Sequence, residues 1–201
     1  MQPFLKRKTT PKVRGGKPLR KNRTALSPHY RHLAPDRPVI DRQRPGLGYR
    51  HLILKRDVKR FIAMLPEWDE ISRGLRAIVL AAGDPDCMGW HRPGMVAVCA
   101  WDRVLSGEWC SRFVEAHRAI LERLEVPVRR LAHETCRVEW TERSARGFQL
   151  VHVLLHELGH HHDRMTTRSK WRASRGEPYA ESYANEHAER LWERYFDAFG
   201  W

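Results

Sequence analysis

The pentapeptide His156-Glu157-Leu158-Gly159-His160 holds the residues of this chain whose types and spacing best suit chemistry. On a helix its two histidines lie one turn apart on one face, so both imidazoles can reach a single metal ion. Zinc suits the pair because it binds neutral imidazole and tolerates the open coordination position that catalysis needs. Glu157 is rotated by about 100° from His156. We therefore expect Glu157 to be a general base for a metal-activated water and not a third ligand.

The segment around the pentapeptide predicts a helix. Residues 148–155 are mostly apolar, and the two residues inside the motif, Leu158 and Gly159, are uncharged. A buried amphipathic helix with ordinary histidines is the alternative to a metal site. The apolar run and a suitable later ligand favour the metal site.

A three-histidine site is excluded by the residues that follow the motif. The pattern HExxHxxGxxH needs Gly at 163 and His at 166, where this chain has Asp163 and Thr166. The third ligand is therefore expected to be a glutamate on a following helix, either Glu177 or Glu181.

The segment after Gly176 predicts the helix that carries this glutamate. Pro178 suits a first helical position, and residues 179–199 repeat apolar side chains at helical spacing. Glu181 lies one turn into this helix among small residues that allow close packing, so we expect it to bind the metal. Glu177 is expected at the solvated helix end.

Four further residues of this helix are candidates for the site. Asn185, one turn after Glu181, could hydrogen-bond a liganding imidazole. Tyr179, Tyr183 and His187 could stabilise an oxyanion, with packing in the core as the alternative for each.

The two motifs together resemble the ImmA/IrrE type of zinc metallopeptidase and, more broadly, the gluzincins. That family pairs HELGH with a later ExxANxFA stretch, and this chain has Glu181-Ser-Tyr-Ala-Asn-Glu-His-Ala. The resemblance covers residues 148–192. It implies zinc ligands His156, His160 and Glu181, with Glu157 as catalytic base. His187 departs from the pattern, because it stands where the family usually has an aromatic residue.

The net charge divides the chain in two. Residues 1–50 hold 14 Lys and Arg against 2 Asp and Glu, and residues 51–201 hold 23 against 22. Seven of the 12 prolines also lie in the first fifty residues. We expect residues 1–48 to form a disordered basic arm, which either binds nucleic acid or an acidic protein or merely solvates the chain.

Residues 49–201 suffice for one domain with its own core. The pattern predicts an α+β fold in which a small mixed sheet packs on helices, beside a zincin-like HExxH helix and the following glutamate-bearing helix. The segments outside these two helices are expected to be a helix at 55–65, strands at 75–81 and 95–101, a helix at 109–124 and an edge strand at 136–141. An extended substrate could pair with that edge strand, although it could equally be plain structural cover.

The remaining composition indicates the compartment. The chain has four widely spaced cysteines, expected to be free thiols, and no secretory or long apolar segment. We expect a soluble cytoplasmic protein without a membrane anchor.

We therefore predict a hydrolase with one Zn²⁺ per chain, most simply a metallopeptidase acting on a peptide or protein. Two other hypotheses stay open. One is a non-catalytic zinc-stabilised module whose basic arm binds nucleic acid or an acidic partner. The other is a zinc hydrolase of non-peptide amides.

Overall fold

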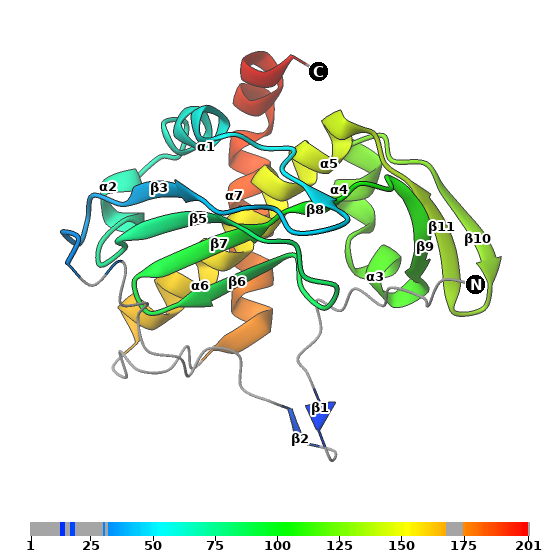
Figure 1. The fold of residues 1–201 in the computed structure, drawn as a ribbon, viewed down its shortest axis with the longest axis horizontal. Helices are drawn as coiled ribbons and strands as arrows, with labels where there is room; N and C mark the ends of the chain where they lie inside the picture. The colour runs from blue at the N-terminus through cyan, green and yellow to red at the C-terminus, as the bar shows by residue number, and fades with distance from the viewer. Residues whose placement is uncertain (1–12, 15–16, 19–29, 31, 168–174, 201) are drawn as a thin grey trace.

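The computed structural model describes residues 13–14, 17–18, 30, 32–167 and 175–200. It confirms the α+β class: several small sheets and helices share one chain (Figure 1). The strands are β1 (Val13–Arg14), β2 (Lys17–Pro18), β3 (Val39–Arg42), β4 (Tyr49–Arg50), β5 (Ala77–Ala81), β6 (Gly89–Arg92), β7 (Met95–Cys99), β8 (Trp101–Asp102), β9 (Ser106–Cys110), β10 (Val128–Ala132) and β11 (Thr135–Glu139). The helices are α1 (Lys55–Ile62), α2 (Trp68–Ile71), α3 (Ser111–Ala116), α4 (Arg118–Arg123), α5 (Glu142–Phe148), the π-helix η2 (Gln149–Leu154), α6 (Leu155–Thr166) and α7 (Gly176–Phe199).

The largest sheet has four strands in the order β3-β5-β7-β6. The strands β3, β5 and β7 are parallel, and β6 runs antiparallel to β7 at the edge. The predicted strands at 75–81 and 95–101 are confirmed as β5 and β7, which are buried along their whole length. Both are apolar on both faces, as parallel strands covered on both sides usually are.

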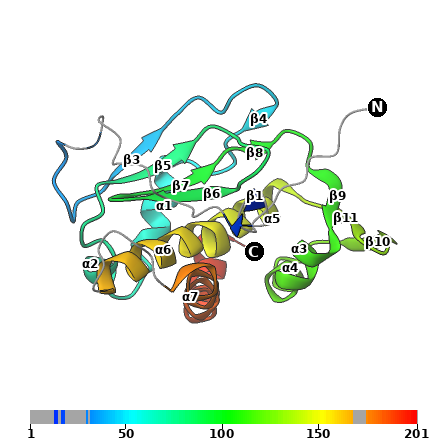
Figure 2. The same cartoon turned by 90° about the horizontal axis from the view of Figure 1, so that it is seen from below.

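Helices cover one face of this sheet. Side chains such as Ile78, Leu80, Val96 and Val98 point from it into the main core. Figure 2 shows α6 beneath the sheet and α7 beneath α6, so the two helices that carry the motifs are stacked in layers. The opposite face is lined by smaller side chains such as Ala77 and Ala97. This alternation follows from the two-residue period of a strand.

A second sheet has three antiparallel strands in the order β10-β11-β9. The predicted edge strand at 136–141 is wrong in its position, because β11 is the middle strand and pairs with β10 on one side and β9 on the other. The edge strand that packs beside the motif helix is instead β6. It is four residues long and carries His91 and Arg92, so its pattern is too short and polar to be recognised from sequence.

The predicted helix at 109–124 is divided in the structure. Trp109 belongs to β9, and the helical segment breaks at His117, which separates α3 from α4 with φ −111° and ψ 16°. The helix predicted at 55–65 is confirmed as α1, which begins at Lys55 and ends three residues early, at Ile62.

Residues of the predicted basic arm take part in the sheet. The strand β3, at residues 39–42, pairs with β5, and the Tyr30 hydroxyl donates a hydrogen bond to Asp41. The folded part of the chain therefore begins before residue 48. The disorder expected for the arm falls mostly on residues 1–29, most of which lie outside the described residues. Across the described ranges, no helix is long and apolar enough to cross a membrane.

Candidate metal centre

A nearly continuous helical run positions the motif. Thr141 caps α5, since its hydroxyl accepts a hydrogen bond from the Ser144 backbone N–H. The run then passes through η2 into α6, and its apolar residues 150, 151, 153, 154, 155 and 158 are buried in the core. The π segment ends at Leu154, two residues before His156. Such segments are frequent at functional sites.

His156 and His160 project toward the first turn of α7. The Nε2 atom of His156 lies 3.2 Å from the Glu177 carboxylate, and the Nε2 atom of His160 lies 3.5 Å from it. One donor atom from each of the three residues lies within 4.8 Å of the others. Two imidazoles and one carboxylate are the ligand set that zinc takes in many hydrolases.

His160 supplies the observation that tests whether a metal fits. Its side chain is buried, and neither ring nitrogen has a hydrogen-bond partner among the described residues. Buried polar atoms are nearly always satisfied, and a metal ion at Nε2 would satisfy one of these two. The residues present therefore fit a zinc ion held by His156, His160 and Glu177.

Glu181 lies on the other side of His156. Its Oε2 atom is 3.2 Å from His156 Nδ1 and 3.8 Å from His152 Nε2. The sequence predicts Glu181 at the metal and Glu177 at the solvated helix end, whereas in the structure the Glu177 carboxylate lies near the Nε2 atoms of both motif histidines. Contacts run in opposite order along α6 and α7, so Glu177 faces His156 and His160, and Glu181 faces His152 and His156.

Asp163 explains why Glu177 is held in place. Its buried carboxylate accepts hydrogen bonds from the backbone N–H groups of Arg175 and Gly176 and from the Arg175 guanidinium. Gly176 has φ 70°, a conformation that glycine adopts without strain. These contacts fasten the start of α7 to the end of α6. The helix consequently begins at Gly176, two residues before the expected first helical position at Pro178, and Glu177 falls in its first turn.

Gly159 brings the two helices close together. A Cβ atom at this position would lie 2.9 Å from Ala180 Cα and 3.1 Å from the carbonyl oxygen of Ala180. Only a residue without a side chain allows this approach. The close approach lets the short glutamate side chains of α7 reach the imidazoles of α6.

Glu157 is buried against the edge strand β6. A Cβ atom on Gly89 would lie 2.9 Å from Glu157 Cγ, so the strand passes directly over this side chain. The Oε2 atom of Glu157 has no hydrogen-bond partner in the described part of the chain. A carboxylate placed beside two ligands, with an oxygen left to accept a proton, is suited to general-base chemistry.

The electrostatics of the cluster favour cation binding. Burial lowers the pKa of His156, but hydrogen bonds to Glu177 and Glu181 outweigh it and raise the pKa to about 9. Burial likewise raises the pKa of Glu181, but its contacts with His156, His152 and His117 outweigh that effect and lower the pKa to about 2. Without a metal, the two carboxylates hold a proton on His156, in the place that a metal cation would take.

The other residues expected at the site lie elsewhere. Asn185 is exposed, and no hydrogen bond joins it to either motif imidazole within the described ranges. The hydroxyl of Tyr179 lies 2.6 Å from His162 Nδ1, and Tyr183 stacks on His187 with ring centroids 4.0 Å apart. At about 100° per residue, these rings project away from the face that carries the two glutamates. The structure therefore does not place them as oxyanion stabilisers.

His91 on β6 is a further histidine near the site that was not predicted from the sequence. Its ring is buried, stacks on the His160 ring at 6.2 Å, and has neither nitrogen hydrogen-bonded within the described residues. Burial and the neighbouring Arg164 hold its pKa well below the ordinary value. Only its place in a four-residue strand marks it, and that strand is not apparent from sequence.

Comparisons with known proteins add no relative. No protein-family model matches the chain. No curated protein and no solved structure matches it either.

Proposed function

We propose that this chain is a zinc-dependent metallohydrolase that cleaves peptide bonds, with Glu157 as the general base. The observation that carries the proposal is the convergence of the His156 and His160 Nε2 atoms on one carboxylate. Beside them lies the buried Glu157, with an oxygen that has no hydrogen-bond partner among the described residues. The resemblance of the two motifs to the ImmA/IrrE peptidases supports the same function.

The roles of the residues follow from their positions. His156, His160 and Glu177 would hold the zinc ion, which when bound polarises a carbonyl and lowers the pKa of a water molecule. Glu157 would take a proton from the attacking water and deliver it to the leaving amine. Glu181 would accept a hydrogen bond from His156 Nδ1 and so fix the orientation and tautomer of that ring.

The edge strand β6 supports a peptide as substrate. Among the described strands it pairs with β7 alone, and it lies directly against Glu157. An extended peptide could add to its outer edge by backbone hydrogen bonds, which would bring a peptide bond to the metal centre.

The test compares wild type with Glu157→Gln on a peptide library read by mass spectrometry, together with zinc content. Gln keeps the volume of the side chain but cannot take the proton, so turnover should fall by at least about 10²-fold while zinc is retained. Glu193→Gln, an exposed position on α7, is the matched control and should match wild type. Equal cleavage by wild type and Glu157→Gln would contradict the role of Glu157. Absence of cleavage by the zinc-loaded wild type would favour a non-catalytic zinc module.

A further inference from the structure

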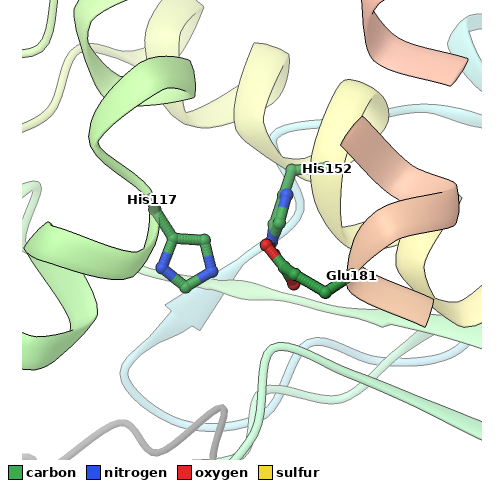
Figure 3. Close-up of side chains that lie close together, drawn as sticks. All are labelled: His117, His152 and Glu181. Atoms are coloured by element: carbon green, nitrogen blue, oxygen red, sulfur yellow. Dashed lines mark ion pairs between the residues drawn. The ribbon is translucent and has the colours of Figure 1, made fainter. Parts of the chain in front are cut away.

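A second group of metal-binding side chains lies beside the first, on the far side of His156. It consists of His117, His152 and Glu181, and one donor atom from each lies within 4.8 Å of the others. Figure 3 shows the two rings and the carboxylate converging from separate elements. His117 lies at the junction of α3 and α4, His152 lies in η2, and Glu181 lies in α7.

The hydrogen bonding of His117 leaves an acceptor facing Glu181. Its Nδ1 atom is 2.7 Å from the carbonyl oxygen of Phe113, which can only accept, so Nδ1 carries the proton. The other nitrogen, Nε2, then presents a lone pair, because burial at 4% exposure opposes a second proton. Figure 3 shows a ring nitrogen of His117 on the side nearest Glu181. The Glu181 side chain is 34% exposed, and a cation between its carboxylate and this lone pair would satisfy both acceptors.

The distance from His152 to Glu181 also suits a shared cation. His152 Nε2 and Glu181 Oε2 are 3.8 Å apart, which is too long for a direct hydrogen bond. Donors that share one zinc ion, at bond lengths of about 2.0–2.2 Å, lie roughly 3.3 Å from each other. A small shift of either side chain would complete that arrangement.

We propose that His117, His152 and Glu181 hold a second divalent transition-metal ion. Two imidazoles and a carboxylate suit zinc and also ferrous iron. The ion cross-links the α3–α4 junction to η2 and α7, and it fixes the carboxylate that contacts His156 Nδ1. This site goes beyond the proposed function, because it requires no catalysis at Glu157.

The experiment counts zinc in the full-length protein. The protein is stripped with a strong chelator, reloaded with zinc in the presence of a weak competing chelator, passed through gel filtration and analysed by mass spectrometry of the metal. Wild type should hold two zinc ions per chain. His117→Phe should hold one, and Phe keeps the ring contacts with Phe113 and Phe148. His160→Ala, which removes a ligand of the first centre, should also hold one.

His187→Phe is the matched control. His187 is also buried, and its Nδ1 atom is 3.0 Å from the carbonyl oxygen four residues earlier, that of Tyr183. It belongs to neither group of ligands, so this variant should keep two zinc ions.

A single zinc in wild type contradicts a protein that holds two ions, and the variants then show which centre holds the ion. Loss in His160→Ala alone overturns the second site and leaves the proposed function standing. Loss in His117→Phe alone keeps the site at His117 and contradicts the centre at His156 and His160. Two ions that both persist in a folded His117→Phe protein also overturn this assignment.

Discussion

Gly89 and Glu157 are in such close contact that a single methyl group on Gly89 would come within 2.9 Å of Glu157 Cγ. The same methyl group would lie 2.8 Å from the carbonyl oxygen of Ala97 and 2.8 Å from Val153 Cγ1. The edge strand, the sheet and the motif helix therefore meet at one glycine. The position of the Glu157 side chain relative to β6 depends on that contact.

Gly89→Ala should impair both stability and turnover. Overpacking at this contact should lower the free energy of unfolding by about 1–3 kcal/mol, because neighbours on two sides must move. Displacement of β6 from Glu157 should also reduce peptide cleavage by the zinc-loaded enzyme. Urea unfolding and steady-state kinetics measure the two effects.

Gly107→Ala is the control for this substitution. Gly107 lies in β9, and a Cβ atom there would have no neighbour closer than 3.7 Å. Its stability and activity should stay near wild type. If Gly89→Ala behaves in the same way, the close packing of β6 on Glu157 is not important.

Asp163→Ala should loosen the start of α7. The substitution removes the acceptor of two backbone N–H groups and of the Arg175 guanidinium, at a cost of about 2 kcal/mol in unfolding free energy. Glu177 would lose its fixed position, so zinc affinity should fall in a titration against a chromogenic chelator. Asp197→Ala, exposed on the same helix, should change neither quantity. Unaltered zinc affinity in Asp163→Ala would show that Asp163 does not position Glu177.

The stability of the metal-free protein should depend on pH through His156. Burial opposes its charge, but Glu177 and Glu181 raise its pKa to about 9, above the ordinary 6.5. A raised pKa stabilises the fold fully below pH about 6.5, and this contribution, at most roughly 3 kcal/mol, is lost as the pH rises through about 9. Chemical unfolding of chelator-treated protein at pH 6, 8 and 10 measures the loss.

The zinc-loaded protein should lack this pH dependence. A ligated imidazole carries no proton on the liganding nitrogen, so stability should change little between pH 7 and 9 when zinc is bound. His156→Gln in the metal-free form should remove the slope as well. A slope that persists in that variant would assign the titration to another group.

The basic arm is tested by two deletions. Residues 1–29 contain nine Lys and Arg and no Asp or Glu, whereas residues 39–42 form β3. Deletion of residues 1–29 should leave the fold and zinc content intact. Deletion of residues 1–48 removes β3 and Tyr30 and should unfold the domain.

If the arm binds nucleic acid, the full chain should bind it with an affinity that falls steeply between low and physiological salt. The chain that lacks residues 1–29 should lose most of this binding. Affinity that does not change with salt, or that survives the deletion, would refute an electrostatic tether.

The sequence predicts the motif helix and the later glutamate-bearing helix because their apolar residues recur at helical spacing. It predicts the strands β5 and β7 because each is a continuous apolar run. It does not predict β6, which is only four residues long and begins with a glycine, or β3, which lies in a proline-rich basic segment. The choice between Glu177 and Glu181 depends on where α7 begins. That start is set by contacts between Asp163 and the backbone of residues 175 and 176, which are distant in sequence from the motif. His117 joins the cluster only through a helix break that periodicity does not show.

The register of α7 along α6 decides whether Glu177 or Glu181 faces His156 and His160. Imidazoles recur every four residues along the run from η2 into α6, at 152, 156 and 160, and carboxylates recur every four residues along α7, at 177 and 181. A slide of α7 by one turn, about 5.4 Å, would present Glu181 to His156 and His160 and carry Glu177 past the pair. The arrangement implied by the ExxAN motif and the arrangement in the structure thus differ by a single step of one helix along the other. The carboxylate of Asp163, which binds the backbone at the start of α7, holds the helix in its present register.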